Sequence, residues 1–136
     1  MSKLYVVDTH ALVWHLLGDP NLGTAAREVL VDPQSRLVVP AICLLELFGL
    51  VEKKRIASIP CQQLLQDLPA DPRITIAPLD MANLYSCLLL KGFKDLHDRS
   101  IVATALTYRD RGFDVALLTR DRFITEECGL PIVWDK

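Results

Sequence analysis

The stretch "LYVVDTHALVWHL" at residues 4–16 decides the predicted fold of this chain. Its first four residues are an apolar run with two valines, which is typical of a strand covered on both faces of a parallel sheet. After Asp8 the apolar residues follow a helical spacing, so the stretch predicts a strand at residues 3–8 and a helix at residues 9–17. Asp8 therefore stands at the junction of two apolar elements, where burial of a carboxylate needs an explanation.

The rest of the sequence repeats this alternation of strands and helices. Further strands are predicted at residues 36–40, 74–79 (as an edge strand), 115–119 and 131–134. Helices are predicted at residues 24–32, 41–55, 60–68 and 80–91, from His97 or Asp98 to Gly112, and in a short form within residues 120–127. This alternation predicts an α/β fold: one domain over residues 1–136, with three α/β/α layers around a mainly parallel sheet.

Composition excludes several classes of protein. The chain has 136 residues and a net charge of −2, which argues against nucleic-acid binding by bulk charge but permits a local basic rim. Its four cysteines show no metal-ligand spacing, and reduced cysteines in a compact domain are typical of the cytoplasm. Neither a signal peptide nor an apolar segment of about 18 residues is found, so neither secretion nor a membrane span is expected.

Two acidic residues stand at or just past the ends of predicted buried strands. Asp8 follows "LYVV" and Asp121 follows "VALLT", and ligands of open parallel sheets bind at the carboxyl ends of the strands. Aspartate after a strand is also a common N-cap of the next helix, so capping and function are equally good interpretations of Asp8. Asp98, in "DLHDR", stands at the start of the apolar helix "SIVATAL", where capping is again the alternative.

Glu46 makes capping an insufficient explanation for the whole set. It lies inside "AICLLELFGL", where a lone ionised carboxylate is costly unless it is paired, binds a metal or faces water on a narrow polar strip. Clustered carboxylates repel one another unless a cation neutralises them, and oxygen ligands select Mg²⁺ or Mn²⁺ rather than zinc. We therefore interpret four residues as metal ligands and catalytic residues: Asp8, Glu46, Asp98 and Asp121.

Four segments, taken in order, resemble the acidic motifs of the PIN domain family: "YVVDTHALVWHL", "LLELFGLVEKKRI", "DLHDRSIVATAL" and "LLTRDRFI". The wording "DTHALVW" and "TRDR" is most similar to VapC-type toxin ribonucleases, and the resemblance runs from about residue 3 to residue 134. It implies a three-layer α/β/α fold, Mg²⁺- or Mn²⁺-dependent cleavage of RNA, a homodimer, and inhibition by a small cognate antitoxin. By motif position it assigns the acidic site to Asp8, Glu46, Asp98 and Asp121.

The chain departs from this family pattern at two places. Where the family often has "DPxDR", this chain has Leu96 in the proline position, so Asp95 and Asp98 are both candidates. We favour Asp98, because it adjoins Arg99 and the apolar helix, and keep Asp95 as a supporting residue. The polar residue that often precedes the helical glutamate has no counterpart in residues 40–43.

Neighbours of the acids supply further candidates. Thr9, whose hydroxyl suits the orientation of a ligand or of water, and Thr119 are the other supporting residues. Phosphate groups of RNA need cations, so the arginines that flank the acids are predicted phosphate contacts, with ion pairs to nearby acids as the alternative: Arg99, Arg120 and Arg122.

Several other polar and aromatic residues have ordinary interpretations. The cations at residues 53–55 complement a helix dipole, with RNA contact as the alternative. Trp14 and Trp134 are interpreted as core or interface residues, because apolar neighbours surround both. His10 is interpreted as a packing or surface residue, and His97 as a residue that helps to cap its helix.

The acidic pocket predicts metal-dependent in-line hydrolysis of a phosphodiester, which needs no serine, cysteine or histidine nucleophile. A phosphatase of the haloacid dehalogenase type needs a second aspartate where this chain has His10, and a receiver-like domain needs an early acidic pair and a late lysine. A non-catalytic PIN-like scaffold is the alternative function, although a scaffold has no reason to keep four repelling carboxylates. The predicted helices at 24–32 and 41–55 are rich in leucine and valine, which suits either an antitoxin segment or ordinary core.

Overall fold

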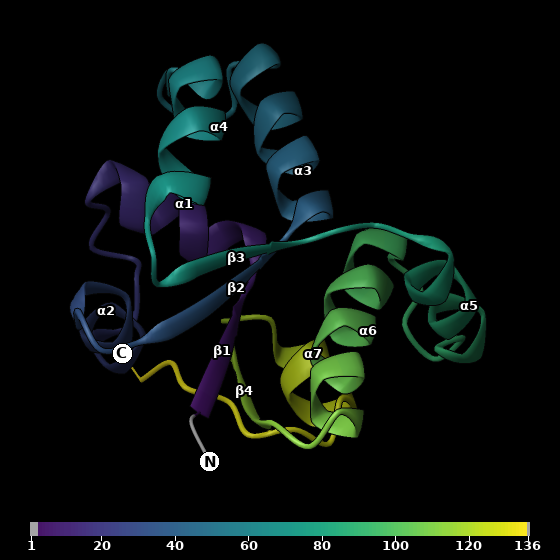
Figure 1. Cartoon of the computed structure of the whole chain (residues 1–136). Helices are drawn as coiled ribbons and strands as arrows, with labels where there is room; N and C mark the ends of the chain where they lie inside the picture. Colours follow the sequence, from purple (N-terminus) through teal and green to yellow (C-terminus); the bar gives the residue numbers. More distant parts are fainter. Residues whose placement is uncertain (1–2, 136) are drawn as a thin grey trace.

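A four-stranded parallel sheet forms the centre of the computed structural model, which describes residues 3–135. The strands lie in the order β3-β2-β1-β4 (Figure 1). All three pairings are parallel, so the prediction of a mainly parallel sheet is confirmed. The strand bounds are β1 (Lys3–Val7), β2 (Arg36–Pro40), β3 (Ile74–Ala77) and β4 (Asp114–Leu118).

Helices cover both faces of this sheet and complete the three predicted layers (Figure 1). One layer holds α1 (Thr9–Leu17), α2 (Thr24–Val31), α3 (Ala41–Glu52) and α4 (Cys61–Ala70). The other layer holds α5 (Met81–Leu89), α6 (Leu96–Asp110) and α7 (Arg122–Glu127), with α5 outermost beside α6. No helix in residues 3–135 is long and apolar enough to cross a membrane.

Alternation along the strands divides the core in two. Val7 of β1 and Val39 of β2 pack under α1–α4, whereas Val6 and Val38 face α6 and α7. Apolar residues therefore fill both faces of each central strand, which is why the strands appear in the sequence as continuous apolar runs. Polar residues follow directly at the carboxyl ends of two strands, Asp8 after β1 and Thr119 after β4.

The predicted strand at residues 131–134 is reduced to a single parallel bridge, in which Leu117 N bonds to the Pro131 carbonyl and Val133 N to the Leu117 carbonyl, each at 2.9 Å. Only Ile132 forms a bridge, with Leu117 of β4, and no ladder continues from it. The Trp134 carbonyl accepts a 3.2 Å hydrogen bond from Ala26 N at the start of α2, so the segment is drawn away from the sheet. The close approach of this carbonyl also explains Gly23, where an added Cβ atom would lie 2.2 Å from the Trp134 oxygen.

Three predicted helix bounds also need correction. The helix at residues 41–55 ends at Glu52, where Lys53 N bonds to the Gly49 carbonyl and the chain turns. The helix at residues 60–68 continues to Ala70, because Pro69 falls in its last turn and removes only one intrahelical hydrogen bond. The helix predicted from His97 or Asp98 begins earlier, at Leu96.

Candidate active site

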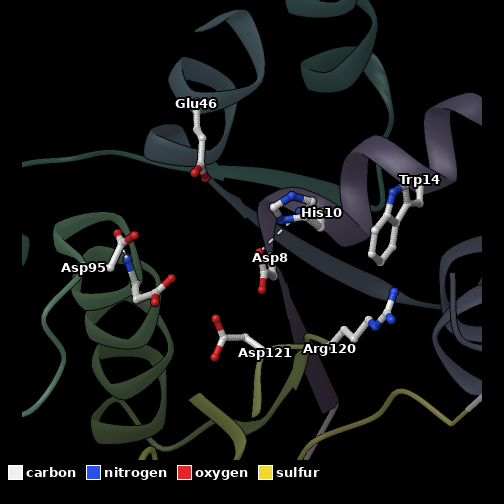
Figure 2. Close-up of a pocket in the computed structure, with 8 residues that line it drawn as sticks. Asp8, His10, Trp14, Glu46, Asp95, Arg120 and Asp121 are labelled. Atoms are coloured by element: carbon white, nitrogen blue, oxygen red, sulfur yellow. Dashed lines mark hydrogen bonds between the residues drawn. The ribbon is translucent and has the colours of Figure 1, made fainter. Parts of the chain in front are cut away.

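An open pocket of about 390 Å³ lies at the carboxyl end of the sheet and brings together side chains from both helical layers (Figure 2). Its acidic lining comes from the ends of β1 and β4, from α3 and from the start of α6. The four acids selected from the sequence all line this pocket, together with the supporting candidate Asp95: Asp8, Glu46, Asp95, Asp98 and Asp121. Their predicted convergence is therefore what the structure shows.

Asp8 is held rigidly at the end of β1. Its backbone N–H donates to the Leu118 carbonyl of β4 at 3.1 Å, and its side chain is 8% exposed. Oδ1 accepts from His10 N at 3.3 Å, and Oδ2 accepts from the Thr119 hydroxyl at 2.5 Å. Burial raises the pKa of Asp8, the Thr119 hydrogen bond opposes that rise, and the Glu46 carboxylate adds to it.

Capping and a place in the pocket are combined in three of the acids. Asp8 is the N-cap of α1, Asp121 of α7 and Asp95 of α6. Asp121 Oδ1 accepts from Ile124 N at 3.0 Å, and Asp95 Oδ1 accepts from His97 N at 2.8 Å. The interpretation of Asp98 as a cap is wrong, because α6 begins two residues earlier and Asp95 caps it.

Asp98 does not cap a helix, and the surroundings of its carboxyl group disfavour the ionised form. Burial, followed by the charges of neighbouring carboxylates, raises its pKa to about 7. The largest of these charge effects comes from Asp95, and smaller ones come from Asp121, Asp8 and Glu46. The neighbouring carboxylates of the pocket thus add to the rise in the Asp98 pKa that burial causes.

Glu46 projects from α3 toward the pocket with a side chain that is 26% exposed. His97 Nδ1 lies 3.5 Å from Glu46 Oε2 and 3.6 Å from Asp95 Oδ1, so His97 joins α3 to the start of α6. This contact was not predicted from the sequence, in which residues 40–43 offer no polar support for Glu46. The support comes instead from the histidine inside the "DLHDR" motif, which is distant in sequence.

Of the three arginines that flank the acids, only Arg120 lines the pocket. Its guanidinium carbon lies 5.4 Å from the centre of the Trp14 ring, within the range of a cation–π contact. Arg99 is tied instead to the carbonyl of Phe93 through Nε, and Arg122 is an exposed residue at the start of α7.

Trp14 is partly buried against the core, as predicted, but it also forms a wall of the pocket. His10 is exposed, as predicted, but it also lines the pocket, and its ring lies 5.4 Å from the Trp14 ring. Trp134 stands 6.0 Å from Trp14 on the other side. This wall could have been predicted from the sequence. His10 and Trp14 are four residues apart, so they share one face of the helix that Asp8 caps.

Thr9, the other supporting candidate, does not line the pocket. It is 1% exposed, and its hydroxyl lies beside the Cys43 thiol. Burial raises the pKa of that thiol, and nearby carboxylates raise it further, so Cys43 is an unreactive core residue. Its Sγ donates to the Val7 carbonyl at 3.5 Å.

The donor set fits a hard divalent cation by its chemistry. The pocket offers carboxylate oxygens and no thiolate. Burial and then the neighbouring carboxylates raise the pKa of Asp98, and a cation would offset the repulsion among these carboxylates. Within residues 3–135, no three acidic, histidine or cysteine side chains are gathered tightly enough to enclose an ion as they stand.

Comparison with known proteins identifies the family. The family model for the PIN domain matches residues 5–126, so this chain belongs to the PIN domain family, and the resemblance of its motifs is confirmed. No curated protein matches the sequence.

Solved structures of complexes share the fold over nearly the whole chain. VapBC2 from Rickettsia felis, solved with a DNA fragment from its promoter, has a TM-score of 0.62 and 18% identity, with 95% of this chain and 96% of that chain covered. FitAcB from Neisseria gonorrhoeae has a TM-score of 0.62 and 16% identity (94% and 95% covered). A toxin–antitoxin complex from Klebsiella pneumoniae has a TM-score of 0.60 and 22% identity (95% of each chain covered).

Proposed function

We propose that the protein is an endoribonuclease that hydrolyses RNA phosphodiester bonds with Mg²⁺ or Mn²⁺. One observation carries the proposal: four acids from separate elements line one open pocket. Membership of the PIN domain family supports the reaction class, because PIN domains are generally nucleases. The residues that would hold the cation are Asp8, Glu46, Asp98 and Asp121.

Each side chain has a distinct part in the proposed reaction. A divalent cation held by the acids would supply positive charge to the phosphodiester and would activate water for in-line attack. Thr119 and the His10 backbone fix the two oxygens of Asp8, so that this carboxylate does not reorient during the reaction. Arg120, held over Trp14 at the edge of the pocket, binds a phosphate oxygen of the RNA.

We further propose that the enzyme is the toxin of a toxin–antitoxin pair that acts in the cytoplasm. The structural likeness to VapBC-type complexes over about 95% of the chain supports this assignment. An apolar pocket of about 340 Å³ between α3, α4 and β3 offers a place for an apolar antitoxin segment. Leu44 of α3, Leu65 of α4 and Ile76 of β3 line this pocket. The docking surface predicted on the helix at residues 41–55 therefore continues onto α4.

A homodimer is the second proposed assembly, and α5 supports it. The only buried residue of this helix is a polar one, Asn83, which bonds to Ser100 and Thr104 of α6. The apolar side chains at helical spacing face outward, with exposed fractions of 62%, 47%, 65% and 62% for Met81, Leu84, Tyr85 and Leu88. A helix that buries its polar residue and exposes its apolar face suits burial against a second copy.

The test of the ribonuclease is cleavage of a mixed pool of structured RNA by the purified protein, with Mg²⁺, with Mn²⁺ and with a chelator. Asp8→Asn, prepared in the same way, controls for a contaminating nuclease. We expect cleavage that needs metal and is lost in Asp8→Asn, while the variant keeps its fold.

The alternative function, a non-catalytic PIN-like scaffold, makes the opposite prediction. A scaffold would not cleave any RNA in the pool, and millimolar Mg²⁺ or Mn²⁺ would not raise its melting temperature. Both results together would replace the ribonuclease proposal with the scaffold. For the toxin assignment, induced expression in a bacterial host should arrest growth, and Asp8→Asn should not.

A further inference from the structure

A second pocket, of about 440 Å³, meets the acidic pocket at Glu46, which lines both. It runs along one face of α3 from Glu46 to Lys53, and Arg55 and His97 complete its walls. We call it the α3 groove. Lys53, the C-cap of α3, follows Glu46 by seven positions, which corresponds to about 10 Å along the helix axis.

The α3 groove has the opposite charge to the acidic pocket. Lys53 and Arg55 line it, whereas Lys54 between them does not. In the part of the chain that the structure describes, neither Lys53 nor Arg55 forms an ion pair. Complementarity to the α3 dipole explains why cations gather at this helix end, but it does not explain their placement along the wall of a groove that opens into the acidic pocket.

Gly49 also lines the groove, and its presence there supports a binding role independently of the charges. Glycine inside a helix costs about 1 kcal/mol relative to alanine. Here nothing lies within 4 Å of an added Cβ atom, and the backbone does not have a positive φ, so neither packing nor conformation requires glycine. A missing side chain that leaves open space in a groove allows a ligand to approach the helix closely.

These observations point to one occupant. We propose that the α3 groove binds the RNA backbone next to the scissile bond, with Lys53 and Arg55 on its phosphates and the bare surface at Gly49 under its sugar. The inference rests on the proposed ribonuclease function and adds the path that the RNA strand takes across the site. The RNA strand crosses the acidic pocket from Arg120 at one end to the α3 groove at the other, past Glu46 and His97.

The test measures binding of a fluorescent single-stranded RNA to Asp8→Asn protein, in which cleavage does not interfere. Lys53→Glu with Arg55→Glu should weaken binding about tenfold and reduce the slope of log K against log salt by about 1.4, the value for two phosphate contacts on a single strand. Lys54→Glu is the matched control, because it makes the same kind of charge change beside the groove. It should weaken binding clearly less than the double variant does, because Lys54 does not line the groove.

A variant without a charge change separates the groove from general electrostatics. Gly49→Gln replaces glycine with a good helix former and should raise the melting temperature by about 3 °C. Its side chain should at the same time fill the groove and weaken RNA binding about threefold. A gain in stability together with a loss of binding is not expected of a residue that serves the fold alone.

The outcomes distinguish the two proposals. If the wild-type chain cleaves RNA while the groove variants bind it as tightly as Lys54→Glu, the groove inference is wrong and the ribonuclease stands. The cations of the groove would then be assigned to binding an acidic segment of a protein partner. If the wild-type chain neither cleaves nor binds RNA with any metal, both proposals fail together.

Discussion

The Thr119 hydroxyl donates to Asp8 Oδ2 and accepts a 3.0 Å hydrogen bond from Asp121 N, so one side chain joins two acids from opposite ends of the chain. Thr119 is 1% exposed, so these bonds are shielded from bulk solvent. Thr119 therefore sets where the first and the last acid of the pocket stand relative to each other.

Removal of this hydroxyl should impair the reaction more than the fold. Thr119→Val keeps the shape of the side chain but leaves Asp8 Oδ2 without its donor, and we expect cleavage to fall about 10- to 100-fold. Thr119→Ser keeps the hydroxyl and should retain most of the activity. Cleavage rates at saturating metal, with circular dichroism of each variant, make the comparison; equal rates for the two variants would remove Thr119 from the site.

The stability of the metal-free protein should depend on pH through Asp98. Its pKa is about 7 in the folded protein, above the ordinary value of 3.8, so the folded state binds more protons between these values. The Asp98 contribution is thus fully present below pH 3.8 and is lost as the pH rises through 7. Burial lowers the pKa of His15, which acts in the opposite direction near neutral pH.

Asp98→Asn isolates this contribution. The difference in melting temperature between Asp98→Asn and wild type, measured in chelator, should grow in favour of the variant from pH 5 to pH 8. Added Mg²⁺ should reduce the difference by stabilising the wild type. A difference that stays constant over this pH range would show that the Asp98 carboxyl titrates alike in the folded and unfolded protein.

Arg120 should affect the binding of RNA rather than the chemical step. Loss of one phosphate contact in Arg120→Gln should raise KM about fivefold, leave kcat within about twofold, and reduce the salt slope by about 0.7. Arg122→Gln makes the same change two residues away, outside the pocket lining, and serves as the control. A fall in kcat at unchanged KM would place Arg120 in the chemical step instead.

The apolar face of α5 should control the oligomeric state. Leu88→Glu places a charge on that face and should turn a dimer into a monomer in sedimentation experiments, because a buried unpaired charge opposes association. Val31→Glu on α2 is the control, since Val31 and Leu88 are both 62% exposed. A wild-type chain that sediments as a monomer at micromolar concentration would refute the dimer itself.

The strands and the convergence of the acids could be predicted because both depend on simple rules. Apolar runs identify buried strands, and the carboxyl ends of parallel strands meet at one edge, which brings Asp8 and Asp121 together. The place of Asp95 as the cap of α6 depends on the hydrogen bonds of a single turn, which the sequence leaves open between Asp95 and Asp98.

Contacts between distant elements could not be predicted. The link from His97 to Glu46 requires the relative rotation of α3 and α6, and the position of Arg120 over Trp14 requires that of α1 and β4. The tail at residues 131–134 has a strand-like pattern, but a hydrogen bond from α2 to the Trp134 carbonyl competes with the sheet.

The pairing of β1 with β4 has a consequence for the synthesis of the protein. β1 can pair with β4 only after residues 114–118 have been translated, and Asp121 comes later still. A nascent chain that carries Asp8, Glu46 and Asp98 therefore lacks the strand that completes the pocket. If the enzyme cuts RNA, the ribosome that makes it is spared until the last acid has left the exit tunnel.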